Sequence, residues 1–143
     1  MKHWLVKTEP ETFSWNDLVQ KGQDHWDGVR NYQARNNLKD MKAGDLVLVY
    51  HSGTGKEVMG IARVVREYYP DPTTDDDRWV AVDFKPIRSL ERPVGLGELK
   101  SDPRLEGLPL LRHTRLSVMP VDKQEFDLIV EMARIHLPSR QVS

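Results

Sequence analysis

The chain has 143 residues, of which 38% are hydrophobic and 30% charged, as expected for one globular domain with its own core. It has no cysteine, which excludes disulfides, thiolate catalysis and cysteine-ligated zinc. Lys and Arg number 21 against 22 Asp and Glu, so the chain lacks the basic excess typical of proteins that bind a long nucleic-acid backbone. It also lacks a long apolar run or a signal-like N-terminus, so we expect a cytoplasmic protein without a membrane span.

The N-terminal residues predict a strand followed by a short helix. Apolar side chains alternate through Lys2–Lys7, and Pro10 ends this strand. Ser14 followed by Asp17 is a capping pair that predicts the start of a helix. Gly22 is the residue at which we expect that helix to end.

A loop and a second short helix are expected next. Trp26–Arg30 have no clear periodicity, and Gly28 allows a close backbone turn there. Asn31 is suited to cap a helix that extends to about Met41. The pair Gly44–Asp45 then predicts a turn.

The middle of the chain predicts three strands. Leu46–Tyr50 is a continuous apolar run, typical of a buried central strand. Ser52–Lys56 is a flexible turn, and Val58–Val65 is the returning strand. Residues 70–77 form a polar, acidic loop, and the alternating pattern of Trp79–Phe84 predicts the next strand.

Residues 86–111 are rich in proline and glycine and predict a loop with one helical turn near residues 97–100. Arg115–Met119 are predicted to form the last strand. Asp122 and Glu125 then predict the start of a C-terminal helix, whose apolar stripe extends to Leu137 before Pro138.

These elements indicate a mixed α/β (α+β) fold with about five to six strands, short flanking helices and a C-terminal helix. The strands and helices do not alternate regularly enough for a doubly wound sheet. We expect one domain over residues 1–138 and a frayed tail over residues 139–143.

The segment WDGVRNYQARN, residues 26–36, concentrates side chains suited to hold one nucleobase. Its aromatic and guanidinium groups offer flat faces for stacking, and its three amides offer hydrogen bonds to base edges. Each residue also has a structural interpretation: Trp26 as a core anchor, Asn31 as a helix cap, and the others as a solvated helix face.

Five pieces of sequence carry a family resemblance when they occur in this order. They are WLVKTEP at residues 4–10, the segment at 26–36, MKAGD at 41–45, YHS at 50–52 and RLSV at 115–118. Over about residues 2–137 the chain resembles the EVE domain family. The resemblance implies a small PUA-like β-barrel, related to the PUA and YTH folds, with a pocket for a modified base. Thr8 stands where the family more often has Ser.

The resemblance implies recognition of a modified nucleobase, such as a modified cytosine, in DNA or RNA. In this mechanism the base leaves its stack and packs against the rings of Trp26 and Tyr32. Its edge is recognised by hydrogen bonds with Asn31, Ser52 or Glu9. The flanking phosphates are bound by Arg30, Arg35 and Lys7. We expect no catalytic residue, cofactor or metal, and the oligomeric state is left open. The candidate binding residues are Lys7, Glu9, Trp26, Gly28, Val29, Arg30, Asn31, Tyr32, Gln33, Arg35, Asn36, Tyr50, His51, Ser52 and Arg115.

Two other functions stay open at this point. A pocket that extrudes a base also suits a base- or nucleotide-processing enzyme, although the chain shows no convincing nucleophile and base pair. His51 and Ser52 stand at the end of the buried strand, where adjacent side chains face opposite ways, so His51 is not placed to deprotonate Ser52. A small-molecule-binding module with the same pocket is the third alternative.

Overall fold

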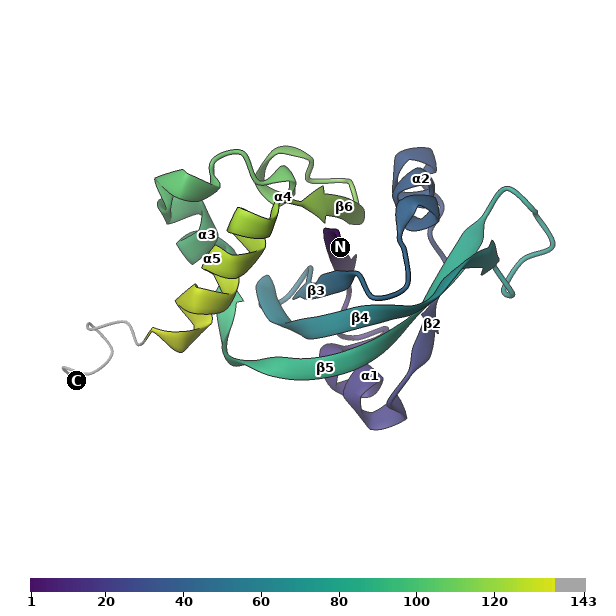
Figure 1. The fold of residues 1–143 in the computed structure, drawn as a ribbon, viewed down its shortest axis with the longest axis horizontal. Helices are drawn as coiled ribbons and strands as arrows, with labels where there is room; N and C mark the ends of the chain where they lie inside the picture. The colour runs from purple at the N-terminus through teal and green to yellow at the C-terminus, as the bar shows by residue number, and fades with distance from the viewer. Residues whose placement is uncertain (136–143) are drawn as a thin grey trace.

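The computed structural model describes residues 1–135, so the expected helix end near Pro138 and the expected tail lie outside the described residues. A six-stranded sheet forms the centre, with five α-helices and one 3-10 helix around it (Figure 1). The strands are β1 (His3–Thr8), β2 (Asp24–Trp26), β3 (Leu46–His51), β4 (Glu57–Pro70), β5 (Val80–Gly95) and β6 (Val118–Val121). The helices are α1 (Trp15–Lys21), α2 (Tyr32–Asp40), α3 (Leu96–Ser101), η1 (Pro103–Leu105), α4 (Pro109–Arg112) and α5 (Lys123–Arg134).

The sheet is open, so the mixed α/β class is confirmed but the closed barrel is wrong. Its order is β2-β5-β4-β3-β1-β6, and the two short strands β2 and β6 form the edges without pairing with each other. Helix α2 contacts both β5 and β6, and α5 follows β6 and packs against β5. In a closed barrel the two edge strands would be joined by backbone hydrogen bonds. Here α2 and α5 instead pack across the gap between the β5 and β6 sides of the curved sheet.

The long strands β4 and β5 extend well beyond the predicted strand ends. Residues 86–95, which we expected to be a loop, continue β5. Pro86 is tolerated because β2 pairs only with Val82–Phe84, so one edge of β5 is unpaired beyond that point. The β4–β5 register also shifts between Ile61 and Ala62, which places a bulge beside the proline.

Two other predicted boundaries are wrong. Trp26, expected in a loop, is the last residue of β2 and pairs with Val82. The last strand begins at Val118 because Arg115 lies in a turn that the Leu116 N–H closes by donating to the His113 carbonyl at 3.1 Å. The loop between α2 and β3, in contrast, has the turn that the Gly44–Asp45 pair predicts.

The helix caps agree with the sequence signals. Ser14 and Asp17 form a reciprocal capping box at the start of α1, and Gly22 ends that helix with φ of 78°. The Asn31 side chain accepts the Ala34 N–H at 2.9 Å and so caps α2. These caps fix the direction in which the chain between the two helices approaches the sheet.

Trp15 connects α1 to the sheet and shows why residue 60 must be small. The Trp15 ring lies directly over Gly60, where a Cβ atom would come within 2.3 Å of Cε2. The Trp15 indole N–H donates to Ser89 Oγ at 2.8 Å. Strand β3 lies between β4 and β1 and its residues 47–49 are buried, as its apolar run predicts.

Candidate functional site

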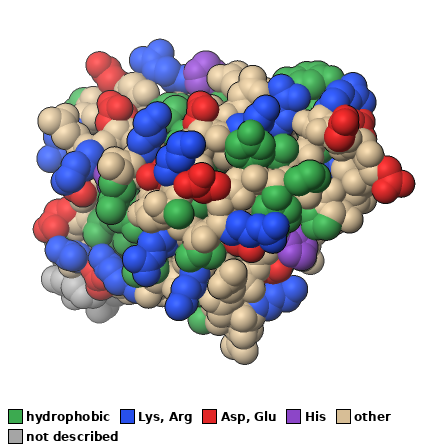
Figure 2. Space-filling model, turned by 45° about the vertical axis from the view of Figure 1, so that its right-hand side comes forward, with side chains coloured by type: hydrophobic (Ala, Val, Ile, Leu, Met, Phe, Trp, Pro, Cys, Tyr) green, Lys and Arg blue, Asp and Glu red, His purple; other side chains and the backbone are tan. Residues whose placement is uncertain are grey.

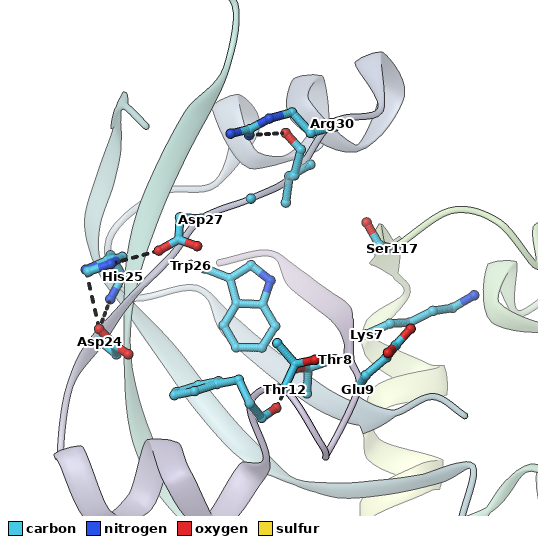
Figure 3. Close-up of a pocket in the computed structure, with 13 residues that line it drawn as sticks. Lys7, Thr8, Glu9, Thr12, Asp24, His25, Trp26, Asp27, Arg30 and Ser117 are labelled. Carbon is cyan, nitrogen blue, oxygen red and sulfur yellow. Dashed lines mark hydrogen bonds and ion pairs between the residues drawn. The ribbon is translucent and has the colours of Figure 1, made fainter. Parts of the chain in front are cut away.

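A cavity of about 490 Å³ opens between the edge strand β2 and the C-terminal end of β1. It therefore lies where the sheet fails to close. Its walls come from β1, the β1–α1 loop, β2, the segment that leads to α2, and one residue before β6 (Figure 3). The lining residues are Lys7, Thr8, Glu9, Thr12, Phe13, Asp24, His25, Trp26, Asp27, Gly28, Val29, Arg30 and Ser117.

Trp26 lies at the centre of this cavity (Figure 3). Its ring is 5.3 Å from the Phe84 ring and packs edge-on against Phe13 at 6.1 Å between centroids. Only 8% of the residue is exposed, so it belongs to the core and to the cavity wall at once. Among residues 1–135 its indole N–H has no hydrogen-bond partner, which leaves one donor available in the cavity.

One side of the cavity combines an imidazole with two carboxylates. His25 lies between them, with Nε2 at 2.8 Å from Asp27 Oδ2 and Nδ1 at 3.3 Å from Asp24 Oδ1. Burial raises the pKa of Asp27, and the charge of His25 opposes that shift. This side is polar and can accept hydrogen bonds through Asp27.

The opposite side carries the ammonium group of Lys7 and the hydroxyl group of Ser117 (Figure 3). Lys7 donates from its backbone N–H to the Ser117 carbonyl at 2.9 Å and from Nζ to the Thr114 carbonyl at 2.8 Å. Burial lowers the pKa of the Lys7 ammonium group. Glu9 follows in the same wall, and its carbonyl accepts the N–H groups of Thr12 and Phe13, which holds the turn that positions the Phe13 ring.

The wall around Gly28 is held from behind by Asp71, a residue of the loop between β4 and β5. Asp71 Oδ2 accepts the Gly28 N–H at 2.9 Å and pairs with Arg30 at 2.9 Å. Its Oδ1 accepts the N–H and hydroxyl of Thr73. Burial alone would raise the pKa of Asp71, but these hydrogen bonds outweigh it and lower the value to about 2.

Six of the fifteen candidate residues line this cavity, and three others line a separate hollow. The six are Lys7, Glu9, Trp26, Gly28, Val29 and Arg30. The three are Asn31, Gln33 and Arg115, in a hollow of about 260 Å³ beside the cavity.

Helix α2 directs Tyr32 and Arg35 toward the residues before β5. The Tyr32 ring lies 5.1 Å from that of Trp79, and the Arg35 guanidinium lies 5.0 Å from the Tyr32 ring. Arg35 also donates to Asn36 Oδ1 at 2.8 Å. These three candidates lie outside the cavity lining.

The strand end at residues 50–52 supports the cavity from behind. Tyr50 is buried, and burial raises the pKa of its hydroxyl. His51 Nε2 accepts the Trp15 N–H at 2.9 Å, and Ser52 donates its N–H to the Thr8 carbonyl at 2.9 Å. His51 therefore holds α1 in place, and its acceptor nitrogen is occupied.

Seven lining residues were absent from the candidates: Thr8, Thr12, Phe13, Asp24, His25, Asp27 and Ser117. The pairing of β2 with β5 brings two of them, Asp24 and His25, into the wall, and a three-residue strand leaves no recognisable pattern. Ser117 could have been predicted from the sequence, because it belongs to the same RLSV motif as Arg115.

The described part of the chain has no group of three His, Asp or Glu side chains placed to hold a metal ion. Within residues 1–135, every helix is too short or too polar to span a bilayer.

Three comparisons relate this fold and cavity to other proteins. The family model of the EVE domain matches residues 2–132. Human thymocyte nuclear protein 1 is 34% identical over 164 residues, which cover 91% of this chain and 73% of the human protein. A crystal structure of an Agrobacterium tumefaciens protein superposes with a TM-score of 0.92 at 40% identity, covering 96% of this chain and 97% of that one.

A further solved structure contains a nucleic acid. The human THYN1 protein, crystallised in complex with DNA that contains 5-methylcytosine, superposes with a TM-score of 0.90 at 33% identity. The superposition covers 96% of this chain and all of that chain.

Proposed function

This chain belongs to the EVE domain family, and we propose on that premise that it is a non-catalytic nucleic-acid-binding protein that holds one modified nucleobase in the cavity beside Trp26. The observation that carries the proposal is the cavity itself. A volume of about 490 Å³ lies within the usual range for small-ligand sites. An aromatic ring at its centre has polar groups on both sides.

The chemistry of the walls matches that of a base. Phe13, Trp26 and Val29 give apolar surface against which a flat ring can pack. The Trp26 N–H and the Lys7 ammonium group are donors for a base carbonyl, and Glu9 and Asp27 are acceptors for an exocyclic amine. A cytosine carries both of these groups, and the human THYN1 complex contains a methylated cytosine.

The base enters this cavity by leaving its stack. The cavity is too small for a duplex, and proteins that read a single base in this way extrude it from the strand. Figure 2 shows Lys and Arg side chains interspersed with Asp and Glu over one face of the molecule. The net charge is −1, so affinity depends more on the inserted base than on general attraction to phosphates.

A methyl group on the base adds a modest amount of affinity when it is buried. Burial of one CH2-sized group contributes about 0.8 kcal/mol, or roughly a fourfold gain in affinity. Stronger discrimination requires that the walls fit the methylated ring closely, so that an unmodified ring leaves a gap.

The test is titration of the full chain with two short single-stranded DNA oligonucleotides that differ only in one cytosine or 5-methylcytosine. Fluorescence anisotropy should show tighter binding of the methylated strand, and mass spectrometry should show that the strand is unchanged after prolonged incubation. Equal affinity for the two strands would reject the proposal. Chemical turnover by substoichiometric protein would instead favour the enzyme alternative.

A further inference from the structure

The hollow beside the cavity has a composition that distinguishes it from the rest of the site. It is lined by Asn31, Gln33, His113, Thr114, Arg115 and Leu116, and this lining contains no carboxylate. The main cavity, in contrast, contains three: Glu9, Asp24 and Asp27. A hollow with a guanidinium, an imidazole and amides, but no acid, favours an anion.

The Arg115 guanidinium makes no hydrogen bond or ion pair with any residue in the range 1–135. Several other exposed arginines in the described chain have carboxylate partners, as Arg78 has with Asp76 at 2.6 Å and Arg104 with Asp102 at 2.8 Å, and Arg112 donates to the Glu106 carbonyl. Arg115 lies in the turn closed by the Leu116 N–H, so its backbone is fixed while its side chain is free. A free guanidinium suits a bidentate contact with a phosphate.

The hollow adjoins the rim of the base cavity at three points. Asn31 directly follows Arg30 of the cavity wall, and Ser117 of that wall follows shortly after Arg115. Lys7 Nζ reaches from the cavity to the Thr114 carbonyl at 2.8 Å. A strand whose base occupies the cavity would therefore have an adjoining backbone phosphate close to this hollow.

We propose that Arg115, with Gln33 and His113, forms a binding site for the phosphodiester group next to the inserted nucleotide. This inference rests on the proposed function and assigns part of the strand to a defined surface. Arg115 supplies the charge and two parallel N–H donors, and Gln33 supplies a neutral amide donor. The site is specific for the backbone and indifferent to the base.

The first experiment compares Arg115→Gln with Arg112→Gln. Arg112 is a matched control in the same segment, because its Nε donates to the Glu106 carbonyl at 2.9 Å and it lies outside the hollow. Arg115→Gln should weaken binding of the 5-methylcytosine oligonucleotide about three- to fivefold, as expected for a solvent-exposed ion pair. It should also reduce the slope of log affinity against log salt by about 0.7, the value for one phosphate of a single strand.

The second experiment removes the charge from the DNA instead. The phosphates on either side of the 5-methylcytosine are replaced, one at a time, by neutral methylphosphonates. For the wild-type protein one replacement should lower affinity about as much as Arg115→Gln does, and the same replacement should have little further effect on the variant. The Arg112→Gln protein should respond to it like the wild type.

The two proposals fail in different ways. If wild-type protein prefers the methylated strand but Arg115→Gln and Arg112→Gln weaken it equally, or if the methylphosphonate effects simply add to the Arg115→Gln effect, the phosphate site is rejected and the base cavity stands. If wild-type protein shows no preference for the methylated strand, the proposed function is rejected first. Free 5-methyl-deoxycytidine should bind wild type and Arg115→Gln equally, because it has no phosphate.

Discussion

Asp71 Oδ2 accepts the backbone N–H of Gly28 at 2.9 Å, and this bond ties the loop between β4 and β5 to the wall of the cavity beside Trp26. The same oxygen pairs with Arg30, so one carboxylate fixes both ends of a short wall segment. Gly28 has φ of 76°, a conformation that other residues rarely adopt. The wall is therefore set by one glycine and one buried acid that is distant in sequence.

Replacement of Asp71 should lower stability and binding together. Asp71 is 2% exposed, so Asp71→Ala leaves the Gly28 and Thr73 N–H groups without their acceptor and should lower the free energy of unfolding by about 3 kcal/mol. Asp71→Asn, which keeps one acceptor oxygen, should lower it less. Urea unfolding measures both, with Asp75→Asn as the control at an exposed acid of the same loop.

The pH dependence of stability gives a second test of Asp71. Its pKa is about 2 in the folded protein and is near 4 in an unfolded chain, so the ionised form favours folding. This contribution, about 2.5 kcal/mol, is present above pH 4 and is lost as the pH falls toward 2. The difference between wild type and Asp71→Asn should therefore shrink over that range. A constant difference would contradict the assignment.

Replacement of Trp26 by Phe should largely preserve the stability of the fold but weaken binding of the methylated oligonucleotide. Trp26→Phe keeps a ring against Phe84 but removes the free indole N–H, so we expect an unfolding free energy within about 1.5 kcal/mol of wild type. Affinity for the methylated oligonucleotide should fall several-fold, because a donor and stacking surface are lost. Trp26→Ala should destabilise by about 3 kcal/mol or more, so it is a poor test of binding. If the Trp26→Phe variant binds the methylated oligonucleotide as tightly as wild type, Trp26 does not contact the base.

Gly60 should be the glycine least tolerant of alanine. The added Cβ would meet the Trp15 ring at 2.3 Å, and that ring is held by its bond to Ser89, so Gly60→Ala should lower stability by about 3 kcal/mol. Gly97→Ala is the matched control, because a Cβ there meets no atom within 4 Å and the residue lies in α3. That change should stabilise by up to about 1 kcal/mol. Thermal unfolding of both variants measures the contrast.

His51 should make stability fall in mild acid. Burial lowers the pKa of His51, and its Nε2 accepts the Trp15 N–H, so the folded protein favours the neutral ring. Because the pKa of His51 is lower in the folded protein than in the unfolded chain, where it is about 6.5, the neutral ring stabilises the fold above pH 6.5. This stabilisation is lost as the pH falls below about 6.5. His51→Gln, which keeps an acceptor, should show a smaller loss of stability between pH 7 and pH 5. An identical loss in both proteins would rule out this role.

Local signals in the sequence predicted the local structure well. The caps at Ser14 and Asn31, the helix end at Gly22 and the buried strand β3 depend on contacts within a few residues, and the structure confirms each of them. The path of β5 through Pro86 was not predicted, because the unpaired edge that accommodates a proline there is set by how far distant β2 extends. The open sheet was not predicted either, because closure depends on whether the edge strands β2 and β6 pair, and these are far apart in the sequence.

The site was only partly visible in the sequence. Trp26 and Arg30 were selected for the chemistry of their segment together with the family resemblance, and Lys7 through the resemblance; all three line the cavity. His25 and Phe13 were missed because they reach it only through the pairing of a very short strand and a turn after β1. Asp71 is the largest omission: an acid in a polar loop predicts solvent exposure, whereas folding buries it behind Gly28.

The walls of the cavity beside Trp26 come from segments that are far apart in the chain, from Lys7 to Ser117, so the cavity exists only in the folded protein. Any compound that fits must then shift the melting temperature upward, by an amount that grows with its concentration relative to its dissociation constant. A panel of modified nucleosides can therefore be ranked by calorimetry, without any knowledge of the genomic context in which the preferred one occurs.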